Sequence, residues 1–254
     1  MSAPIGNAAR FAAAPISGGG TPADEWLLKK DTFPSLPLDQ CPGLVVVAPH
    51  PDDETLGFGA AACGIAARGV DVRTVIASDG GAAWPGLSPS EQARLEESRR
   101  CESRTAAAVL GLPTPTFLGL PDGRLAENES RLADILTDIL AGRPTGTWCA
   151  ATWRGDGHPD HEAVGRAAAI ATARTGTVLL EYPIWMWHWA CPGDDAVPWQ
   201  NAVQLVADPV AVQRKREAIT SFRSQLECDA AGREPILPPH VLERLDRVGE
   251  VVFR

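Results

Sequence analysis

The sequence predicts an α/β fold, in which an open, mostly parallel sheet carries helices on both faces. Short apolar runs rich in β-branched residues alternate with Ala-rich stretches of helical length, which is typical of repeated strand–helix units. The runs are apolar at almost every position, as expected of strands buried on both faces. The chain has 254 residues, 44% of them hydrophobic, so a single domain can bury a full core.

Strands and helices can be placed in order along the first half of the chain. Strands are predicted at residues 44–48, 72–77 and 116–120. Helices are predicted between them at residues 54–68 and 88–110. The second helix has capping-box spacing, with Ser88 before it, Glu91 three residues later and proline at its first position. Gly69 and Gly111 supply the expected helix stops.

The second half continues the alternation and then becomes less regular. Strands are predicted at residues 148–152 and 178–182, and helices at residues 131–141 and 162–175. Beyond these, the sequence predicts only a strand at 203–206 and a helix at 209–226. This last helix is expected to expose Arg214, Lys215 and Arg216 on one side.

A short leader and a single domain are the expected organisation. Residues 1–23 are rich in Ala, Gly, Pro and Ser, which is typical of a flexible segment. Residues 24–254 are expected to form one domain, with its core at about 40–190 and an irregular C-terminal extension at 191–254.

Composition and charge argue against several classes of function. The net charge is −9 and the pI about 5.1, so a nucleic-acid partner is not expected. No apolar run reaches the roughly 18 residues of a membrane span, and the basic-then-apolar layout of a signal peptide is missing. We therefore expect a cytoplasmic protein. Its six separated cysteines are expected to be free thiols or small buried side chains.

Two short motifs bring together histidines and aspartates. Residues 50–54 (His-Pro-Asp-Asp-Glu) directly follow the first predicted strand, and residues 158–161 (His-Pro-Asp-His) follow the fourth. In an open parallel sheet, ligands bind beyond the carboxyl ends of the strands, near the point where the strand order reverses. The first and fourth strands flank that point in common doubly wound orders, so both motifs are expected in one crevice.

The residue types suit a catalytic metal ion. Zinc in hydrolases takes three protein ligands, mostly imidazole and carboxylate, and leaves one position for water. His50, Asp53 and His161 can supply such a set, because His50 and Asp53 are three residues apart and His161 can approach from across the crevice. Iron(II) or another divalent ion suits the same donors.

The remaining polar residues of the motifs suggest catalytic roles. If Asp53 binds the metal, Asp52 points elsewhere and can act as general base toward a zinc-activated water. His158 can polarise the substrate carbonyl or protonate the leaving amine. Asp160 can hold His158 in the required tautomer.

Simpler interpretations exist for each motif alone. A single His-Pro-Asp is usually a surface turn, and acidic residues at a helix start usually cap the helix. Their common position after strands favours a joint metal site. Residues 57–62 weakly resemble a dinucleotide-binding turn, but the acidic tract at 50–54 opposes a phosphate there.

Together, the motifs resemble those of the PIG-L/LmbE-like deacetylase family. The family form of the first motif is Ala-His-Pro-Asp-Asp-Glu, and this chain has Pro49 in place of the alanine. Three further segments also match: a Ser-Asp-Gly loop with serine for the usual threonine, an Arg-x-x-Glu helix and a Pro-Asp-Gly turn, at residues 78–80, 99–102 and 121–123. The resemblance covers roughly residues 40–190.

The resemblance implies a zinc hydrolase of LmbE-like, Rossmann-like fold that removes an N-acetyl or N-acyl group from an N-acetylglucosaminyl-like conjugate. By position, it implies that His50, Asp53 and His161 bind the zinc. It also implies that Asp52 is the general base and His158, supported by the carboxylate two residues later, its electrophilic or acid partner. An amidase of another small conjugate, or a non-catalytic metal-binding protein, are the alternatives.

Substrate contacts are predicted more loosely, at Arg154, Asp122 and His188. Each has a simpler interpretation, as a solvated loop arginine, a Pro-Asp-Gly turn and a structural histidine, respectively. Three tryptophans within residues 185–189 could form one face of a buried strand, a self-interface or a pocket wall. The expected partner is a small amino-sugar conjugate, and self-association is a further expectation.

Overall fold

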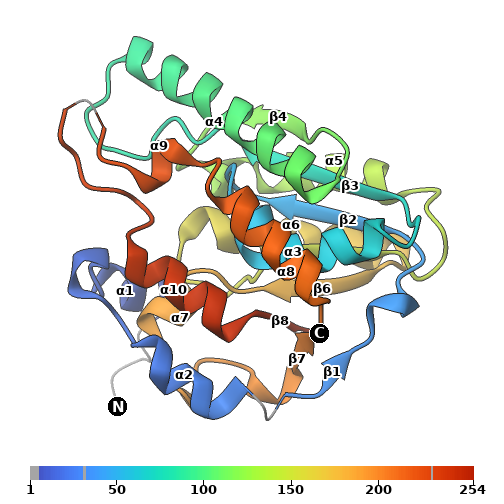
Figure 1. Ribbon diagram of the computed structural model, residues 1–254. Helices are drawn as coiled ribbons and strands as arrows, with labels where there is room; N and C mark the ends of the chain where they lie inside the picture. Colours follow the sequence, from blue (N-terminus) through green and yellow to red (C-terminus); the bar gives the residue numbers. More distant parts are fainter. Residues whose placement is uncertain (1–5, 31–32, 230) are drawn as a thin grey trace.

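The computed structural model describes residues 6–30, 33–229 and 231–254, and a single mixed sheet forms its centre (Figure 1). In this part of the chain the strand order is β1-β7-β8-β6-β5-β2-β3-β4. The strands are β1 Ser35–Leu36, β2 Leu44–Ala48, β3 Val72–Ser78, β4 Thr116–Leu120, β5 Trp148–Thr152, β6 Val178–Tyr182, β7 Ala202–Leu205 and β8 Glu250–Phe253. Among the strands of the described residues, only β8 runs antiparallel to its neighbours, so the predicted open, mostly parallel sheet is confirmed.

Helices cover both faces of the sheet, as predicted. On one face Val45 and Val47 of β2 pack against α5 and α6, while on the other Leu44 and Val46 pack against α3. Because side chains alternate across a strand, a strand covered on both faces has no polar position. The helices are α1 Asn7–Ala12, α2 Ala23–Lys30, α3 Asp53–Ala66, α4 Pro89–Leu110, α5 Glu129–Leu140, α6 Pro159–Thr175, α7 Met186–Trp189, α8 Pro209–Ile219, α9 Arg223–Leu226 and α10 Pro239–Val248.

Local signals in the sequence fix several helix ends. The capping box at the start of α4 forms, since Ser88 Oγ accepts from Glu91 N and Glu91 Oε2 accepts from Ser88 N at 2.8 Å. Gly111 ends the helix in the left-handed conformation, with φ of 70°. This agreement reflects chemistry confined to one turn, which needs no tertiary contact.

Strands β2 and β5 are neighbours, which is the arrangement that the site requires. β2 pairs in parallel with β3 on one side and with β5 on the other. The chain therefore leaves β2 in one direction and returns later on its opposite side, which makes the β2/β5 boundary the switch point of the sheet. The loops that follow these two strands carry the two histidine motifs.

The C-terminal third is more regular than the sequence suggested. β8 inserts between β6 and β7, so residues 250–253 belong to the main sheet. The helix predicted at 209–226 divides into α8 and α9 at residues 220–222. A four-residue strand is too short for periodicity to identify, and its pairing partners lie far away in the sequence.

The tryptophan-rich stretch forms the helical turn α7 and not a strand, so the strand interpretation was wrong. Helical geometry rotates successive side chains by about 100°, which sends the indoles to different places. Trp187 packs edge-on against Trp26 in the core. Trp185 instead contacts Phe11 of α1, beside the histidine motifs.

The segment expected as a leader contains α1 and the 3-10 turn η1 at Ile16–Gly18. Its described part begins at residue 6, and residues 1–5 lie outside the described residues. The segment touches the body of the domain, since Thr21 N donates to His188 O at 3.0 Å.

Lys215 is buried, so the prediction that it lies on an exposed side was wrong. Three consecutive residues cannot share one helix face, and Lys215 points inward. Its ammonium group donates to Leu56 O at 2.7 Å and to Glu250 Oε1 at 2.9 Å. Glu250 also accepts from the backbone of Ala60 and Ala61 at 2.8 Å. This ion pair therefore joins α8, α3 and β8.

Two further observations concern the chain as a whole. In the described residues, no helix combines the length and the apolar character needed to cross a lipid bilayer. All six cysteines are free, and three of them are buried, namely Cys41, Cys63 and Cys149.

We expect Lys215→Met to lower the free energy of unfolding by about 3 kcal/mol, because it leaves the buried Glu250 carboxylate without its cation. The neighbouring control, Arg216→Met, removes an exposed pair with Asp246 and should cost less than about 1 kcal/mol. Urea denaturation followed by circular dichroism measures both values. Equal losses in the two variants would contradict a structural role for the buried pair.

Candidate metal centre and active site

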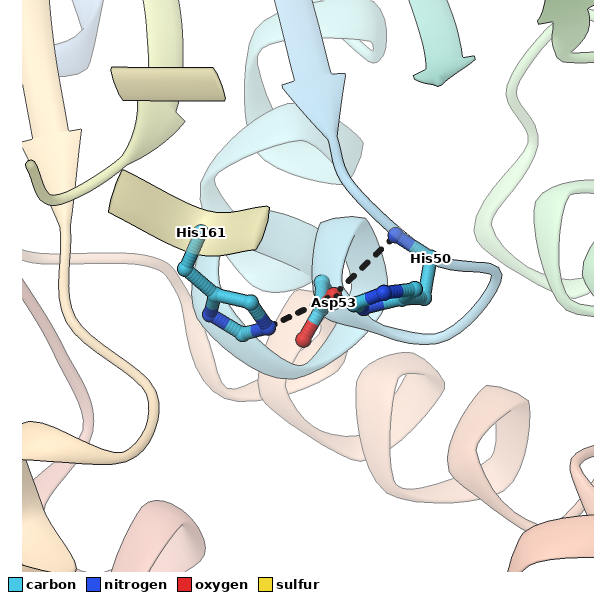
Figure 2. A group of neighbouring side chains, drawn as sticks. All are labelled: His50, Asp53 and His161. Carbon is cyan, nitrogen blue, oxygen red and sulfur yellow. Dashed lines mark hydrogen bonds and ion pairs between the residues drawn. The ribbon is translucent and has the colours of Figure 1, made fainter. Parts of the chain in front are cut away.

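The two histidine motifs meet at the carboxyl ends of β2 and β5, as predicted. His50 lies two residues beyond the end of β2, and Asp53 begins α3. His161 lies in the first turn of α6, which follows β5. Figure 2 shows the three side chains pointing toward one another from these separate elements.

The distances among these side chains fit a divalent metal ion. Asp53 Oδ2 lies 3.2 Å from His50 Nδ1 and 3.3 Å from His161 Nε2. One ligand atom from each of the three residues lies within 4.8 Å of the others. Tetrahedral ligands held about 2.1 Å from zinc are themselves about 3.4 Å apart, so the spacing and the donor set both suit such an ion.

The two histidines are oriented by carboxylates on their opposite nitrogens. His50 Nε2 lies 3.0 Å from Asp122 Oδ1 and 3.3 Å from Asp160 Oδ2. His161 Nδ1 lies 2.8 Å from Asp156 Oδ2. Carboxylates in this position fix the tautomer and leave the other nitrogen free to bind a metal, which is the usual surroundings of metal-binding histidines.

The electrostatics of the cluster favour a cation. Burial lowers the pKa of His161, but the carboxylates of Asp53 and Asp156 outweigh it and raise the value to about 9. Burial raises the pKa of Asp53, yet the neighbouring His161 and His50 hold it well below its usual range. The buried carboxylates thus require positive charge, which either ring protons or a metal ion can provide.

A second group of acceptors shares His50, namely Asp122 and Asp160 on its Nε2 side. The oxygens of Asp160 each already accept a backbone N–H, from Gly123 at 2.7 Å and Leu125 at 3.0 Å. A neutral imidazole has one lone pair for a metal, so His50 can serve only one of the two groups. The group with two histidines and one carboxylate is the better match to a catalytic zinc or iron(II) site.

Asp52 is held in a strained backbone conformation next to the metal ligands. Its φ of 132° is the only positive value among non-glycine residues in the described part of the chain. Arg99 stabilises this turn by donating to Pro51 O at 2.9 Å and to Asp52 Oδ2 at 3.2 Å. Burial raises the pKa of the Asp52 carboxyl, and Arg99 opposes this rise. A raised pKa suits a group that must accept a proton.

Glu54, the last residue of the first motif, supports the same turn from inside. Its Oε2 accepts from Asp52 N at 3.0 Å, and its Oε1 accepts from the Ser103 hydroxyl at 2.8 Å. Burial raises the pKa of Glu54 to about 7. Its role is therefore to position Asp52, in addition to starting the helix as the sequence indicated.

His158 is a neutral hydrogen-bond donor at the pocket. Its Nδ1 accepts from the backbone N–H of Asp160 at 3.2 Å, which leaves the proton on Nε2. Burial, followed by the nearby His161, lowers the pKa of His158 to about 3. The structure differs from the prediction for Asp160, whose carboxylate lies against His50 and the loop at 123–125 and not against His158.

A pocket of about 290 Å³ opens beside these residues. Its polar lining includes His50, Asp52, Asp53, Arg99, Asp122, His158 and His161. His50, Asp53 and His161, the proposed metal ligands, thus contribute to the lining of this pocket.

Of the three predicted substrate contacts, one lines the pocket and two do not. Asp122 lines the pocket, although its oxygens already contact His50 and accept from Ala82 N at 2.7 Å. Arg154 points elsewhere and forms a two-pronged ion pair with Glu181 at 2.9 and 2.8 Å. His188 is buried outside the pocket lining.

Sequence reasoning missed the role of Asp156. Its buried carboxylate contacts His161 and also accepts three backbone N–H groups, those of residues 184–186, at 2.8 to 3.0 Å. The signal was its place two residues before the second motif, but nothing local shows that it reaches His161. The role of Arg99 was also missed, because its partner turn lies 47 residues away from it in the sequence.

Comparison with known families gives a match over the same region. The family profile described as PIG-L, GlcNAc-PI de-N-acetylase, matches residues 45–172. This range contains both histidine motifs and Arg99.

Individual relatives are similar over part of their length. The chain is 28% identical over 187 residues to a 1D-myo-inositol 2-acetamido-2-deoxy-alpha-D-glucopyranoside deacetylase of Mycolicibacterium gilvum, covering 62% of each chain. It is 30% identical over 155 residues to the diacetylchitobiose deacetylase of Thermococcus kodakarensis, covering 59% of this chain and 56% of that one. The matches to these relatives thus span less than two thirds of their length.

A solved structure shares the fold. The N,N'-diacetylchitobiose deacetylase of Pyrococcus horikoshii superposes with a TM-score of 0.56 at 22% identity, over 75% of this chain and 73% of that one. This likeness supports the architecture described above.

We expect Asp156→Asn to weaken zinc binding by about 10-fold to 100-fold, because His161 loses the carboxylate that fixes its tautomer. Competition with a chromogenic chelator measures the affinity. The control, Asp195→Asn, changes an exposed aspartate and should leave the affinity unaltered. Unchanged affinity in the folded Asp156 variant would show that His161 is oriented by something else.

Proposed function

The chain belongs to the PIG-L (GlcNAc-PI de-N-acetylase) family, and on this premise we propose that it is a metal-dependent N-deacetylase. The reaction would be hydrolysis of the amide of an N-acetylated or N-acylated amino-sugar conjugate. The observation that carries the proposal is the convergence of His50, Asp53 and His161 in the lining of a pocket that also contains Asp52 and His158.

The arrangement supports catalysis more than a purely structural metal. A structural zinc is usually enclosed by four protein ligands, whereas the group gathered here has three, and all three line a pocket. A purely structural metal site also does not require the strained backbone at Asp52 or the contact from Arg99 that stabilises it. Strain at a site of this kind is usually retained for function.

Each polar residue has a distinct task in amide hydrolysis. A zinc or iron(II) ion held by His50, Asp53 and His161 would supply Lewis acidity, activating water and polarising the amide carbonyl. Asp52 accepts the proton of the attacking water, because it is the acceptor beside the ligands and burial raises its pKa. His158 donates its Nε2 proton in a hydrogen bond to the carbonyl oxygen as negative charge develops there.

The proton held by Asp52 then passes to the leaving nitrogen as the C–N bond breaks. One water is consumed, and the products are a carboxylic acid, which keeps the second proton of the water, and a free amine. Arg99 keeps the carboxylate of Asp52 aimed at the pocket through both transfers. His158 keeps its own proton throughout, since its lowered pKa favours the neutral ring.

The amino-sugar substrate is proposed from relatives whose names specify acetamido sugars. Asp122, which lines the pocket, is the proposed contact for a substrate hydroxyl. Arg154 and His188 are not proposed as substrate contacts, because neither residue lines the pocket. Zinc as the native ion, a cytoplasmic location and self-association stay predictions.

We expect Asp52→Asn to lower kcat by about 100-fold to 10,000-fold while zinc stays bound, because the proton acceptor is lost and the ligands are kept. The measurement is acetate release from a panel of N-acetylated amino sugars, with metal content determined in parallel. Asp195→Asn serves as the control and should match wild type. Full activity in the Asp52 variant would remove it from the mechanism.

We expect dialysis against a chelator to abolish acetate release and added Zn²⁺ or Fe²⁺ to restore it, because the three ligands hold the ion that activates the carbonyl. Metal content and rate are measured together during titration of the metal-free protein. Activity should saturate at one ion per chain. Undiminished activity of protein shown to be metal-free would contradict the proposal.

A further inference from the structure

The N-terminal segment, residues 7–21, lies beside the second histidine motif. Figure 1 shows its helix α1 next to α7. The ring centroid of Phe11, in α1, lies 5.2 Å from the ring centroid of Trp185 and 6.2 Å from the ring centroid of His158. Phe11 and Ile16 both line the pocket that contains the proposed metal ligands. The segment is therefore part of the pocket wall.

Polar contacts hold the start of this segment in place. Asn7 Nδ2 donates to Gly155 O, on the loop that leads into the second motif, at 2.8 Å. Arg10 forms an ion pair with Asp194. These contacts anchor α1 at two positions that precede Phe11.

Three residues of the body hold the rest of the segment through its carbonyl groups. His188 Nε2 lies 3.1 Å from Ala14 O, and His240 Nε2 lies 3.0 Å from Ile16 O. Arg244 donates to two further carbonyl oxygens of the segment, at 2.6 and 2.8 Å. His188, which the sequence suggested as a substrate contact, thus positions the segment that carries Phe11.

Glycines allow the segment to approach this closely. A Cβ atom on Gly157 would lie 2.8 Å from Phe11 Cβ and 3.1 Å from Asn7 O. A Cβ atom on Gly20 would lie 2.4 Å from the His188 ring. Both glycines also have positive φ. A side chain at either position would therefore clash with its neighbours and strain the backbone.

The pocket has a polar wall and an apolar wall that come from different parts of the chain. All of its charged and histidine residues fall within residues 45–172, the range matched by the family. The apolar wall comes mostly from outside that range, from Phe11, Ile16, Ile184, Trp185, Ile236 and Leu237. The shared region thus supplies the reacting groups, and the flanking segments supply the surface next to them.

We propose that the apolar wall binds an alkyl or acyl group of the substrate, so that Phe11 and Ile16 determine specificity. The substrate class is an amphipathic amino-sugar conjugate with an apolar group next to the scissile amide. This inference rests on the proposed N-deacetylase function. A wholly polar sugar conjugate would leave aromatic and aliphatic surface in contact with water, whereas an apolar group removes that surface from water.

The test compares three substrates on zinc-loaded enzyme: N-acetylglucosamine, N-hexanoylglucosamine and hexyl 2-acetamido-2-deoxyglucopyranoside. At least one hexyl or hexanoyl compound should have a KM about tenfold or more below that of N-acetylglucosamine. The hexanoyl compound places the apolar group on the acyl side, and the hexyl glycoside places it on the sugar side. Equal KM values for all three compounds would overturn the inference.

Phe11→Ala separates a substrate contact from a structural role. We expect it to raise the KM of the preferred amphipathic substrate about tenfold more than it raises the KM of N-acetylglucosamine. The matched control is Phe33→Ala, since Phe33 stacks on Trp199 and lines a different cavity. A parallel loss of kcat on every substrate would show that Phe11 only supports the fold, and would overturn the inference.

Failure of the proposed function can be told apart from failure of this inference. If the wild type cleaves none of the three amides, calorimetric titration with hexyl and methyl glucoside decides the matter. Binding of the hexyl compound about tenfold more tightly, with that advantage lost in Phe11→Ala, would support the apolar site on its own. Equal affinity for both glycosides would overturn it.

Discussion

Burial of carboxylates around two imidazole rings is the constraint on which the site depends. Four carboxylates surround the rings of His50 and His161, namely those of Asp53, Asp122, Asp156 and Asp160. Because the cluster is buried, charge that is not compensated there is costly. Each imidazole directs one nitrogen to an outer carboxylate and the other to Asp53. The result is a pre-oriented set of side chains that carries more negative charge than two neutral rings can balance, and we propose that a metal cation completes it.

The position of that set follows from the topology of the sheet. β2 and β5 are adjacent at the switch point, so loops separated by about a hundred residues in the sequence deliver their side chains to one place. The strained turn at Asp52 is tolerated because Arg99 and Glu54 hold it from two sides. The geometry of the proposed catalytic site therefore depends on α4 as well as on the motifs themselves.

Most of the fold and the meeting of the two histidine motifs could be predicted from the sequence, because both leave local signals. Apolar runs mark buried strands, and the His-Pro-Asp motifs mark the strand ends. Contacts between residues far apart in the chain left no such signal. The sequence prediction therefore placed Lys215 on an exposed face, paired the Asp160 carboxylate with His158 in place of His50, and missed the contact of Asp156 with His161. The packing of Phe11 beside His158 was equally invisible, since it joins residues far apart in the chain.

Anomalous diffraction at the zinc edge from zinc-loaded crystals tests the central claim most directly. We predict one strong peak bounded by His50 Nδ1, an Asp53 oxygen and His161 Nε2, with Asp156 Oδ2 next to Nδ1 of His161. A peak on the Nε2 side of His50, between Asp122 and Asp160, would contradict it. So would the absence of any peak in this cluster.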